Sequence, residues 1–230
     1  MLFQTYGEKC KPAVLFFHAM GVTGASSEPV AKHLQSRCFC ILPTSTVYCA
    51  GQTYRGKADE VRQVEDFLTA QGIGHVFFDG GQFAQIGCAT RHILTPFLYL
   101  AIKSLYWSRG GTLKKIMWCD DDGIKPYFMA AGKNLRYGNM RRQIADSLED
   151  KPFPPMPEDW QKRAFFEFGS IEEHMKYRPA VMQAYPAANF PIFADFNHIQ
   201  YQIRDPKGFA DMLISIMDAG KLPELPFIKA

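Results

Sequence analysis

The segment from Ala13 to Pro43, AVLFFHAMGVTGASSEPVAKHLQSRCFCILP, contains the signals of a strand, a helix and a second strand. Its first five and last five residues are apolar runs of strand length. Between them, Ser26 to Pro29 (SSEP) is typical of a helix start. Two strands joined by a helix pair in parallel, so this segment predicts an α/β fold.

The same alternation continues on the C-terminal side. Residues 57–71 place apolar side chains on one face of a helix, and the strand HVFFD follows at residues 75–79. After a long interruption come a strand at 164–169, a helix at 172–185, a strand at 190–194 and a final helix from 206. The sequence therefore predicts a doubly wound, mainly parallel sheet flanked by helices.

The interruption runs from residue 94 to residue 160 and has a different composition. It is rich in aromatic residues and methionine with helical spacing, and it ends in the proline cluster KPFPPMPEDW. We interpret residues 94–160 as an inserted helical cap and residues 1–93 and 161–230 as the α/β core. A cap of this composition is expected to cover a small, partly apolar ligand.

Composition narrows the classes of partner and cofactor. The 230 residues are 47% hydrophobic, and 26 basic against 23 acidic residues give a net charge of +3. No basic stripe points to nucleic acid and no cationic helix to a membrane, so a small-molecule partner is expected, with the oligomeric state left open. Six cysteines without a C-x-x-C pair argue against a zinc site and for a reducing, cytoplasmic setting.

Other signals argue in the same direction. The apolar run before His18 is too short for a signal peptide. The triplet Asp120 to Asp122 is more typical of a solvated loop or a helix start than of a metal site. No metal or organic cofactor is therefore expected.

Three strand ends carry polar residues, and the carboxyl ends of parallel strands share one edge of the sheet. They are FFHAMG, ending at Gly21, FEFGSIEEH, ending at His174, and ADFNHIQ, ending at Gln200. In this order and spacing the chain resembles the α/β-hydrolase family over nearly its whole length. The resemblance implies hydrolysis of carboxylic ester or acyl bonds, with His198 as general base and Glu172 as the acid that orients it. It also implies an oxyanion site made by the backbone N–H groups of Ala19 and Met20.

The family's nucleophile elbow, G-x-S-x-G, occurs nowhere in the chain. His75 and Val76 resemble the start of the elbow strand, whereas residues 77–81 resemble the next strand and its tip. A β-α-β crossover takes roughly a dozen residues or more, so one central strand and its helix are missing. We expect the strand at 75–79 to take the elbow strand's central position, or the place beside it, paired with residues 13–17.

The other residues that could serve as the nucleophile are weak candidates. Ser26 and Ser27 occupy an expected helix N-cap, Ser45 follows a strand as many turn serines do, and Cys88 lies between small residues after a strand tip. Asp79, at a strand end before two glycines, is the alternative acid. His18 is expected to shape its loop through its side chain rather than to do chemistry.

Three hypotheses follow for the function. The chain is related to ester or acyl hydrolases of small substrates, with the nucleophile not found. Alternatively it is a non-catalytic protein that kept the pocket and binds a small molecule. In the third, the sequence carries an internal deletion of an active hydrolase.

Overall fold

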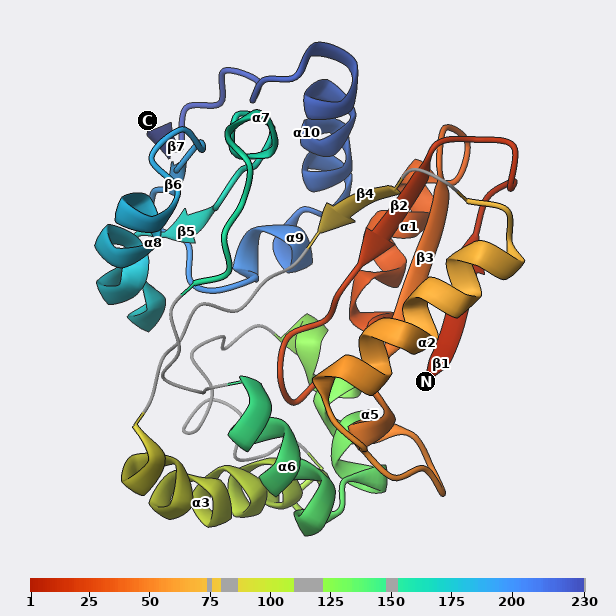
Figure 1. Cartoon of the computed structure of the whole chain (residues 1–230), viewed down its shortest axis with the longest axis vertical. Coiled ribbons are helices and arrows are strands. Elements are labelled where there is room, and N and C mark those ends of the chain that lie inside the picture. The colour runs from red at the N-terminus through yellow and green to blue at the C-terminus, as the bar shows by residue number, and fades with distance from the viewer. Residues whose placement is uncertain (74–75, 80–86, 110–121, 148–152, 230) are drawn as a thin grey trace.

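A computed structural model describes residues 1–73, 76–79, 87–109, 122–147 and 153–229 (Figure 1). Its larger sheet contains β1 (Leu2–Tyr6), β2 (Ala13–Phe16), β3 (Phe39–Thr44) and β4 (Val76–Asp79) in the order β1-β3-β2-β4. β2 pairs in parallel with β3 and β4, and β1 is antiparallel to β3. The 3-10 turn η1 (Gly24–Ser27) and α1 (Glu28–Leu34) connect β2 to β3, and α2 (Lys57–Ala70) connects β3 to β4. The strand-helix-strand unit that the sequence predicts at residues 13–43 is therefore present.

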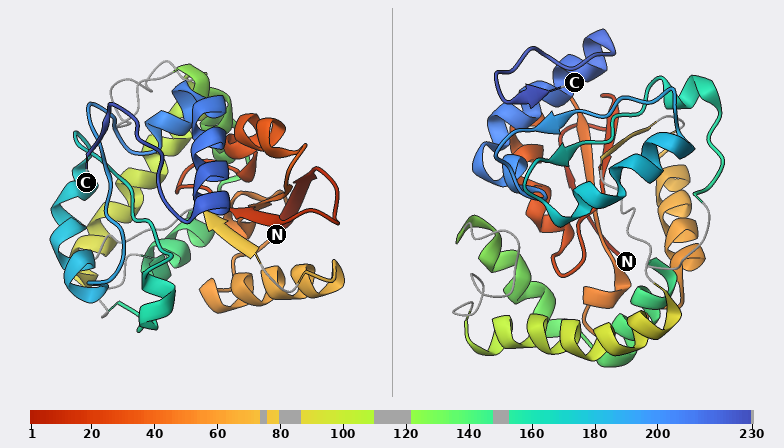
Figure 2. Two further views of the ribbon diagram at one scale, coloured as in Figure 1. Left: turned by 90° about the horizontal axis from the view of Figure 1, so that it is seen from above. Right: turned by 90° about the vertical axis from the view of Figure 1, so that its left-hand side faces the viewer.

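Helices cover both faces of this sheet. On one face, Val14 and Phe16 belong to the apolar cluster that α1 and α10 (Pro206–Ala219) complete. On the other face, Ala13 and Leu15 pack with Val64 of α2. All four residues of β2 are buried because alternate side chains enter opposite layers (Figures 1 and 2). The doubly wound architecture is confirmed.

A second sheet holds β5 (Phe168–Gly169), β6 (Ile192–Phe193) and β7 (Ile228–Lys229), with β5 and β6 parallel and β7 antiparallel. The predicted strands at 164–169 and 190–194 are thus shorter than expected, although an isolated bridge joins Phe165 to Asn189. Pro191 has no N–H to donate, which limits the ladder on this side of β6. The predicted helix at 172–185 divides into the 3-10 helix η4 (Glu173–Tyr177) and α8 (Arg178–Ala184).

The strand at 75–79 takes its expected place beside β2, with Ala13 opposite Val76 and Phe16 opposite Asp79. However, β4 is the last strand of its sheet within the described residues. The described structure therefore corrects the expected central position, because the larger sheet ends at β4 and β5 belongs to the second sheet.

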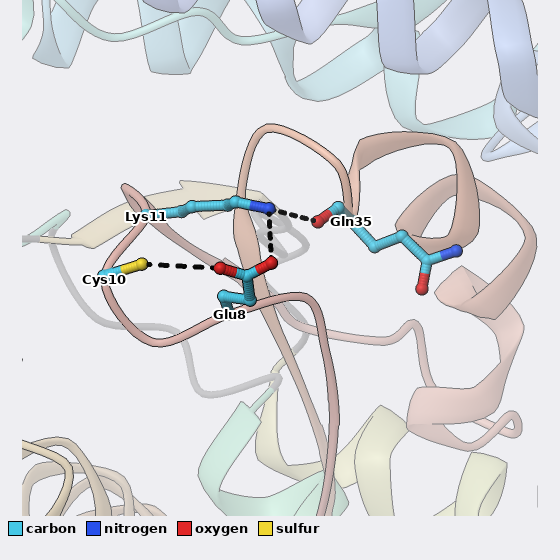
Figure 3. A network of polar contacts seen from close by, with 4 residues as sticks. All are labelled: Glu8, Cys10, Lys11 and Gln35. Atoms are coloured by element: carbon cyan, nitrogen blue, oxygen red, sulfur yellow. Dashed lines mark hydrogen bonds and ion pairs between the residues drawn. The ribbon is translucent and has the colours of Figure 1, made fainter.

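The turn between β1 and β2 is fastened to the end of α1 by exposed polar contacts (Figure 3). Lys11 Nζ donates to Glu8 Oε1 at 3.3 Å and to the backbone oxygen of Gln35 at 3.5 Å. The thiol of Cys10 donates to the other carboxylate oxygen of Glu8 at 3.7 Å. A cation at a helix C-terminus is favourable, but exposed pairs of this kind stabilise a fold by less than about 1 kcal/mol.

Three helices lie beyond the carboxyl end of β3: α3 (Cys88–Trp107), α5 (Lys125–Asn134) and α6 (Tyr137–Ser147) (Figures 1 and 2). The 3-10 turn η2 (Thr46–Tyr48), directly after β3, packs Val47 and Tyr48 against their apolar side chains. The proposed boundary at residue 94 falls inside α3. That these helices form a separate cap remains a prediction. The other helices of the described residues are η3 (Asp122–Ile124), α7 (Glu158–Gln161) and α9 (Gln200–Arg204).

Candidate active site

Two loops at the carboxyl ends of neighbouring parallel strands carry the predicted acid and base. Glu172 follows β5, and His198 follows β6. Nδ1 of His198 lies 3.1 Å from Oε2 of Glu172. The glutamate side chain is 4% exposed and the histidine side chain is 36% exposed, so a buried carboxylate holds a ring that solvent and ligands can reach.

This contact determines which ring nitrogen of His198 carries the proton. A carboxylate only accepts hydrogen bonds, so Nδ1 carries a hydrogen and the neutral ring keeps its lone pair on Nε2. Among the described residues, no second hydrogen bond to the ring of His198 is found. The arrangement is that of a base whose orienting acid is already in place.

Backbone contacts join the two loops. A Cβ atom on Gly169 would lie 2.2 Å from the backbone oxygen of Phe196, so only glycine allows this close approach. The N–H of Ile171 donates to the same oxygen at 3.3 Å. The N–H of Asp195 donates to Oγ of Ser170 at 2.9 Å. The separation of Glu172 and His198 is therefore set by main-chain packing as well as by their own hydrogen bond.

The loop that presents His198 has an unusual backbone. Asp195 and Ile199 have φ angles of 63° and 54°, in the left-handed region that non-glycine residues rarely adopt. Side chains support this path: Oδ1 of Asn197 accepts from the N–H of His198 at 2.8 Å, and Oε1 of Gln200 accepts from the N–H of Asn197 at 2.8 Å. A strained backbone held by its own side chains is common at functional sites.

A second histidine, His174, lies next to this pair and was missed by sequence analysis. Its ring centroid is 4.9 Å from that of His198, and the rings are tilted by 46°. Burial lowers the pKa of His174, and the nearby His198 lowers it further, while Glu172 and Glu173 act in the opposite direction. The only signal in the sequence is that His174 stands two residues after Glu172, in the segment that follows the same strand.

The loop after β2 contains the predicted oxyanion residues Ala19 and Met20. No acceptor for the N–H of either residue is found within the described part of the chain. Their neighbours are well fastened: the N–H of Gly21 donates to the hydroxyl of Tyr48 at 2.7 Å. Gly21 has a φ of 88°, and a Cβ there would meet Phe128 at 2.9 Å. Backbone N–H groups that have no acceptor among the described residues are what an oxyanion site requires.

The loops after β2 and β6 border one apolar cluster. Ala19 packs on it from the first loop and Ile199, the residue after His198, packs on it from the second. The cluster is formed by four buried side chains from four different segments: Val22, Leu105, Ile124 and Phe128. The cluster that Leu105 of α3 and Phe128 of α5 help to form thus contacts both loops.

Ser45, a weak nucleophile candidate, is buried and engaged in structural contacts. Its hydroxyl donates to Oε1 of Glu60 at 2.8 Å and accepts from the N–H of Val47 at 3.3 Å. The N–H and hydroxyl of Thr46 also donate to Oε1 of Glu60, both at 2.7 Å. One carboxylate oxygen of α2 therefore organises the turn after β3, and the Ser45 hydroxyl is part of that cap.

Cys88 and Asp79 belong to neither of the loops that carry Glu172 and His198. Cys88 is exposed at the first position of α3, with its Sγ 3.7 Å from Nδ1 of His92. That same nitrogen lies 2.9 Å from the backbone oxygen of Cys88, which can only accept, so Nδ1 carries a hydrogen and cannot take a proton from the thiol. Asp79 ends β4, and its side chain lies outside the described part of the structure.

A cavity of about 490 Å³ lies away from these residues, at the opposite end of β6. Its wall includes Arg178, Phe190, Pro191 and Lys229. None of the predicted site residues lines it, so we place the candidate site at His198 on chemical grounds and not at this cavity.

Among the described residues, no group of three or more His, Cys, Asp or Glu side chains is suitably placed for a metal. The described helices include none long and apolar enough to cross a membrane.

Comparison with known proteins gives matches in structure alone; no protein family and no curated protein matches the sequence. An α/β hydrolase family protein from Desulfitobacterium hafniense is 12% identical, with 94% of this chain and 100% of that chain covered and a TM-score of 0.69. An esterase from a marine microorganism is 12% identical, with coverages of 93% and 98% and a TM-score of 0.68. The carboxylesterase CesB (YbfK) from Bacillus subtilis is 15% identical, with coverages of 96% and 88% and a TM-score of 0.61. The chain has the α/β-hydrolase fold.

Proposed function

We propose that this protein is related to hydrolases of carboxylic esters or other acyl bonds, and that its site accepts a small, partly apolar molecule. The observation that carries the proposal is the 3.1 Å contact between Glu172 and His198 at the carboxyl edge of an α/β sheet. Solved structures with the same fold include an esterase and a carboxylesterase. Neither nucleic acid nor a membrane is the proposed partner, and the proposed location is the cytoplasm.

Each retained group has a definite role in such chemistry. Nε2 of His198 would accept the proton of an attacking hydroxyl and later return it to the leaving group. Glu172 would hold the ring in the required tautomer and stabilise its charged form. The N–H groups of Ala19 and Met20 would bind the oxygen on which negative charge develops.

An attacking hydroxyl is not identified among the described residues. The sequence contains no G-x-S-x-G, and the Ser45 hydroxyl donates to Glu60 instead of to a histidine. Among the described residues, no serine hydroxyl forms a hydrogen bond with the ring of His198. This observation favours our second candidate function, binding of a small molecule without turnover.

A fluorophosphonate probe and a p-nitrophenyl ester test the two candidates directly. We expect no covalent labelling, and hydrolysis no faster than that of the His198→Ala variant. Labelling of one serine together with turnover that His198→Ala abolishes would refute the missing nucleophile. Ser45 and Cys88 would then be the candidates for the nucleophile, and the alanine variant of each would test it.

The third hypothesis, an internal deletion, has its own test. The coding sequence around His75 to Phe77 and the intact mass of the protein from its source would be determined. An additional strand-helix segment carrying G-x-S-x-G would establish that the active form is longer. An unchanged sequence would leave the nucleophile-free protein as the natural one.

A further inference from the structure

The cavity of about 490 Å³ beside β6 has the size of a small-molecule site, since such sites have volumes of roughly 300–1,000 Å³. Three segments form its wall: α8, the residues just before β6, and the C-terminal segment that ends in β7. Figure 1 shows α8, β6 and β7 together at one side of the molecule. Neither Glu172 nor His198 lines the cavity, so a ligand bound there would occupy a second site.

Most of the cavity wall is apolar. Seven of its eleven residues carry apolar side chains, namely Met182, Phe190, Pro191, Leu222, Pro223, Leu225 and Ile228. The ring of Phe190 stacks on that of Phe166, with the two centroids 5.4 Å apart. The backbone of Ile228 is fixed by its pairing with Phe193 of β6. The apolar part of a ligand would therefore meet a surface that is already formed.

Charged side chains are unbalanced on this wall. It includes the two cations Arg178 and Lys229 and the single acid Glu224. Within the described part of the chain, none of these three residues forms an ion pair. The wall therefore carries a net charge of one positive unit, which favours a ligand with one negative charge.

The guanidinium of Arg178 has donors that the described residues do not use. Its Nη2 donates to the backbone oxygen of Phe190 at 3.1 Å, which holds the side chain at the wall. Its Nε is the one buried side-chain nitrogen or oxygen that has no hydrogen-bond partner among the described residues. A buried donor without an acceptor is unfavourable, and a carboxylate is an acceptor that a guanidinium binds through two N–H groups at once. Arg178 thus points to an anionic ligand.

We propose that this cavity binds a small carboxylate with an apolar tail, of the type of octanoate. The carboxylate pairs with Arg178 and, more weakly, with the exposed Lys229, and the tail lies against the apolar wall. A doubly charged phosphate fits less well, because it would exceed the net charge of the wall beside Glu224 and would lose its hydration against apolar side chains. The proposal does not depend on the reaction proposed for His198.

Isothermal titration calorimetry with a series of ligands tests what the cavity recognises. Each CH₂ group that enters the cavity should tighten binding by up to about fourfold, so hexanoate should bind more weakly than octanoate by up to about 16-fold. Octan-1-ol has the same tail without the charge and should bind about tenfold more weakly or less tightly still. Equal affinities for octanoate and octan-1-ol, or displacement of octanoate by inorganic phosphate, would overturn the proposed ligand class.

Variants of the wall test where octanoate binds. Arg178→Gln removes the charge but keeps an N–H donor for the backbone oxygen of Phe190, and it should weaken binding by about tenfold or more. Lys229→Ala, at an exposed position, should weaken binding by about two- to fivefold. Lys221→Ala is the matched control and should leave the affinity unchanged, because Lys221 is exposed on the same segment and does not line the cavity.

Circular dichroism would verify that each variant folds. If Arg178→Gln does not fold, the comparison of Lys229→Ala with Lys221→Ala still decides the location. Octanoate that shows no saturable binding would overturn the site. Binding that both wall variants leave unchanged, or that His198→Ala abolishes, would place the carboxylate at the candidate active site instead. None of these measurements requires catalytic activity.

Discussion

The backbone N–H of Ser45 donates to Nε2 of His18 at 3.0 Å, and this contact fixes the neutral form of the imidazole. A backbone N–H can only donate, so Nε2 must carry a lone pair. The proton then resides on Nδ1, which lies 2.9 Å from the backbone oxygen of Ala19. His18 therefore joins the end of β3 to the loop that carries Ala19 and Met20.

His18 should make the protein less stable in acid. Burial lowers its pKa from the ordinary 6.5, against the opposing effects of the Ala19 carbonyl and Glu60. The unfolded chain then binds more protons below about pH 6.5, so unfolding free energy falls with decreasing pH, by at most about 1.4 kcal/mol per unit for one group. Urea titrations between pH 5 and pH 8 should show a shallower slope for His18→Gln. His33→Gln, at an exposed position, should keep the original slope.

Removing the acid should cost stability even if no reaction is catalysed. Glu172→Ala deletes a buried carboxylate and leaves Nδ1 of His198 without its acceptor, and we expect a loss of about 1–3 kcal/mol in unfolding free energy. Glu172→Gln keeps an acceptor oxygen and should lose less. Glu173→Ala, at the exposed neighbour, should stay within about 0.5 kcal/mol. Equal losses for Glu172→Ala and Glu173→Ala would contradict a structural bond at this position.

The ring of His174 should report on His198 directly. Its pKa is lowered first by burial and then by His198, so its NMR titration midpoint should lie below 6.5. His198→Gln removes one of these causes and should raise that midpoint, whereas His33→Gln should leave it unchanged. A midpoint that does not respond to His198→Gln would show that the two rings are not coupled.

Gly169 should tolerate no side chain. Because an added Cβ would lie 2.2 Å from the backbone oxygen of Phe196, Gly169→Ala must push the loops of Glu172 and His198 apart. We expect a loss of more than about 2 kcal/mol, measured by urea denaturation. Gly138→Ala is the control, because nothing lies within 4 Å of its Cβ position in α6. Alanine there should be neutral or slightly stabilising.

Sequence patterns are sufficient to place a helix or strand when the signal lies within that element itself. The apolar run of β2 and the Ser-Ser-Glu-Pro start of α1 depend on local chemistry, so both could be placed without coordinates. The approach of Glu172 to His198 could also be anticipated, because each follows a strand and neighbouring parallel strands end at one edge.

Features that depend on contacts between distant segments could not be read in this way. The two-residue lengths of β5 and β6 result from how Phe165 to Gly169 pairs with Asn189 to Phe193, which no single segment encodes. His174 acquires its importance only from the position of His198. Apolar side chains lie on two opposite faces of α3, and the sequence does not say which of these faces is covered.

The break between β4 and β5 has a mechanical consequence. Within the described residues, no ladder of backbone hydrogen bonds crosses from one sheet to the other. The halves are joined instead by apolar side chains, such as Phe16 on one side and Phe193 and Phe209 on the other, which share one cluster. Such contacts have no preferred direction and weaken on cooling. Amide hydrogen exchange should therefore resolve two cooperative units rather than one, and their opening should become more independent as the temperature falls.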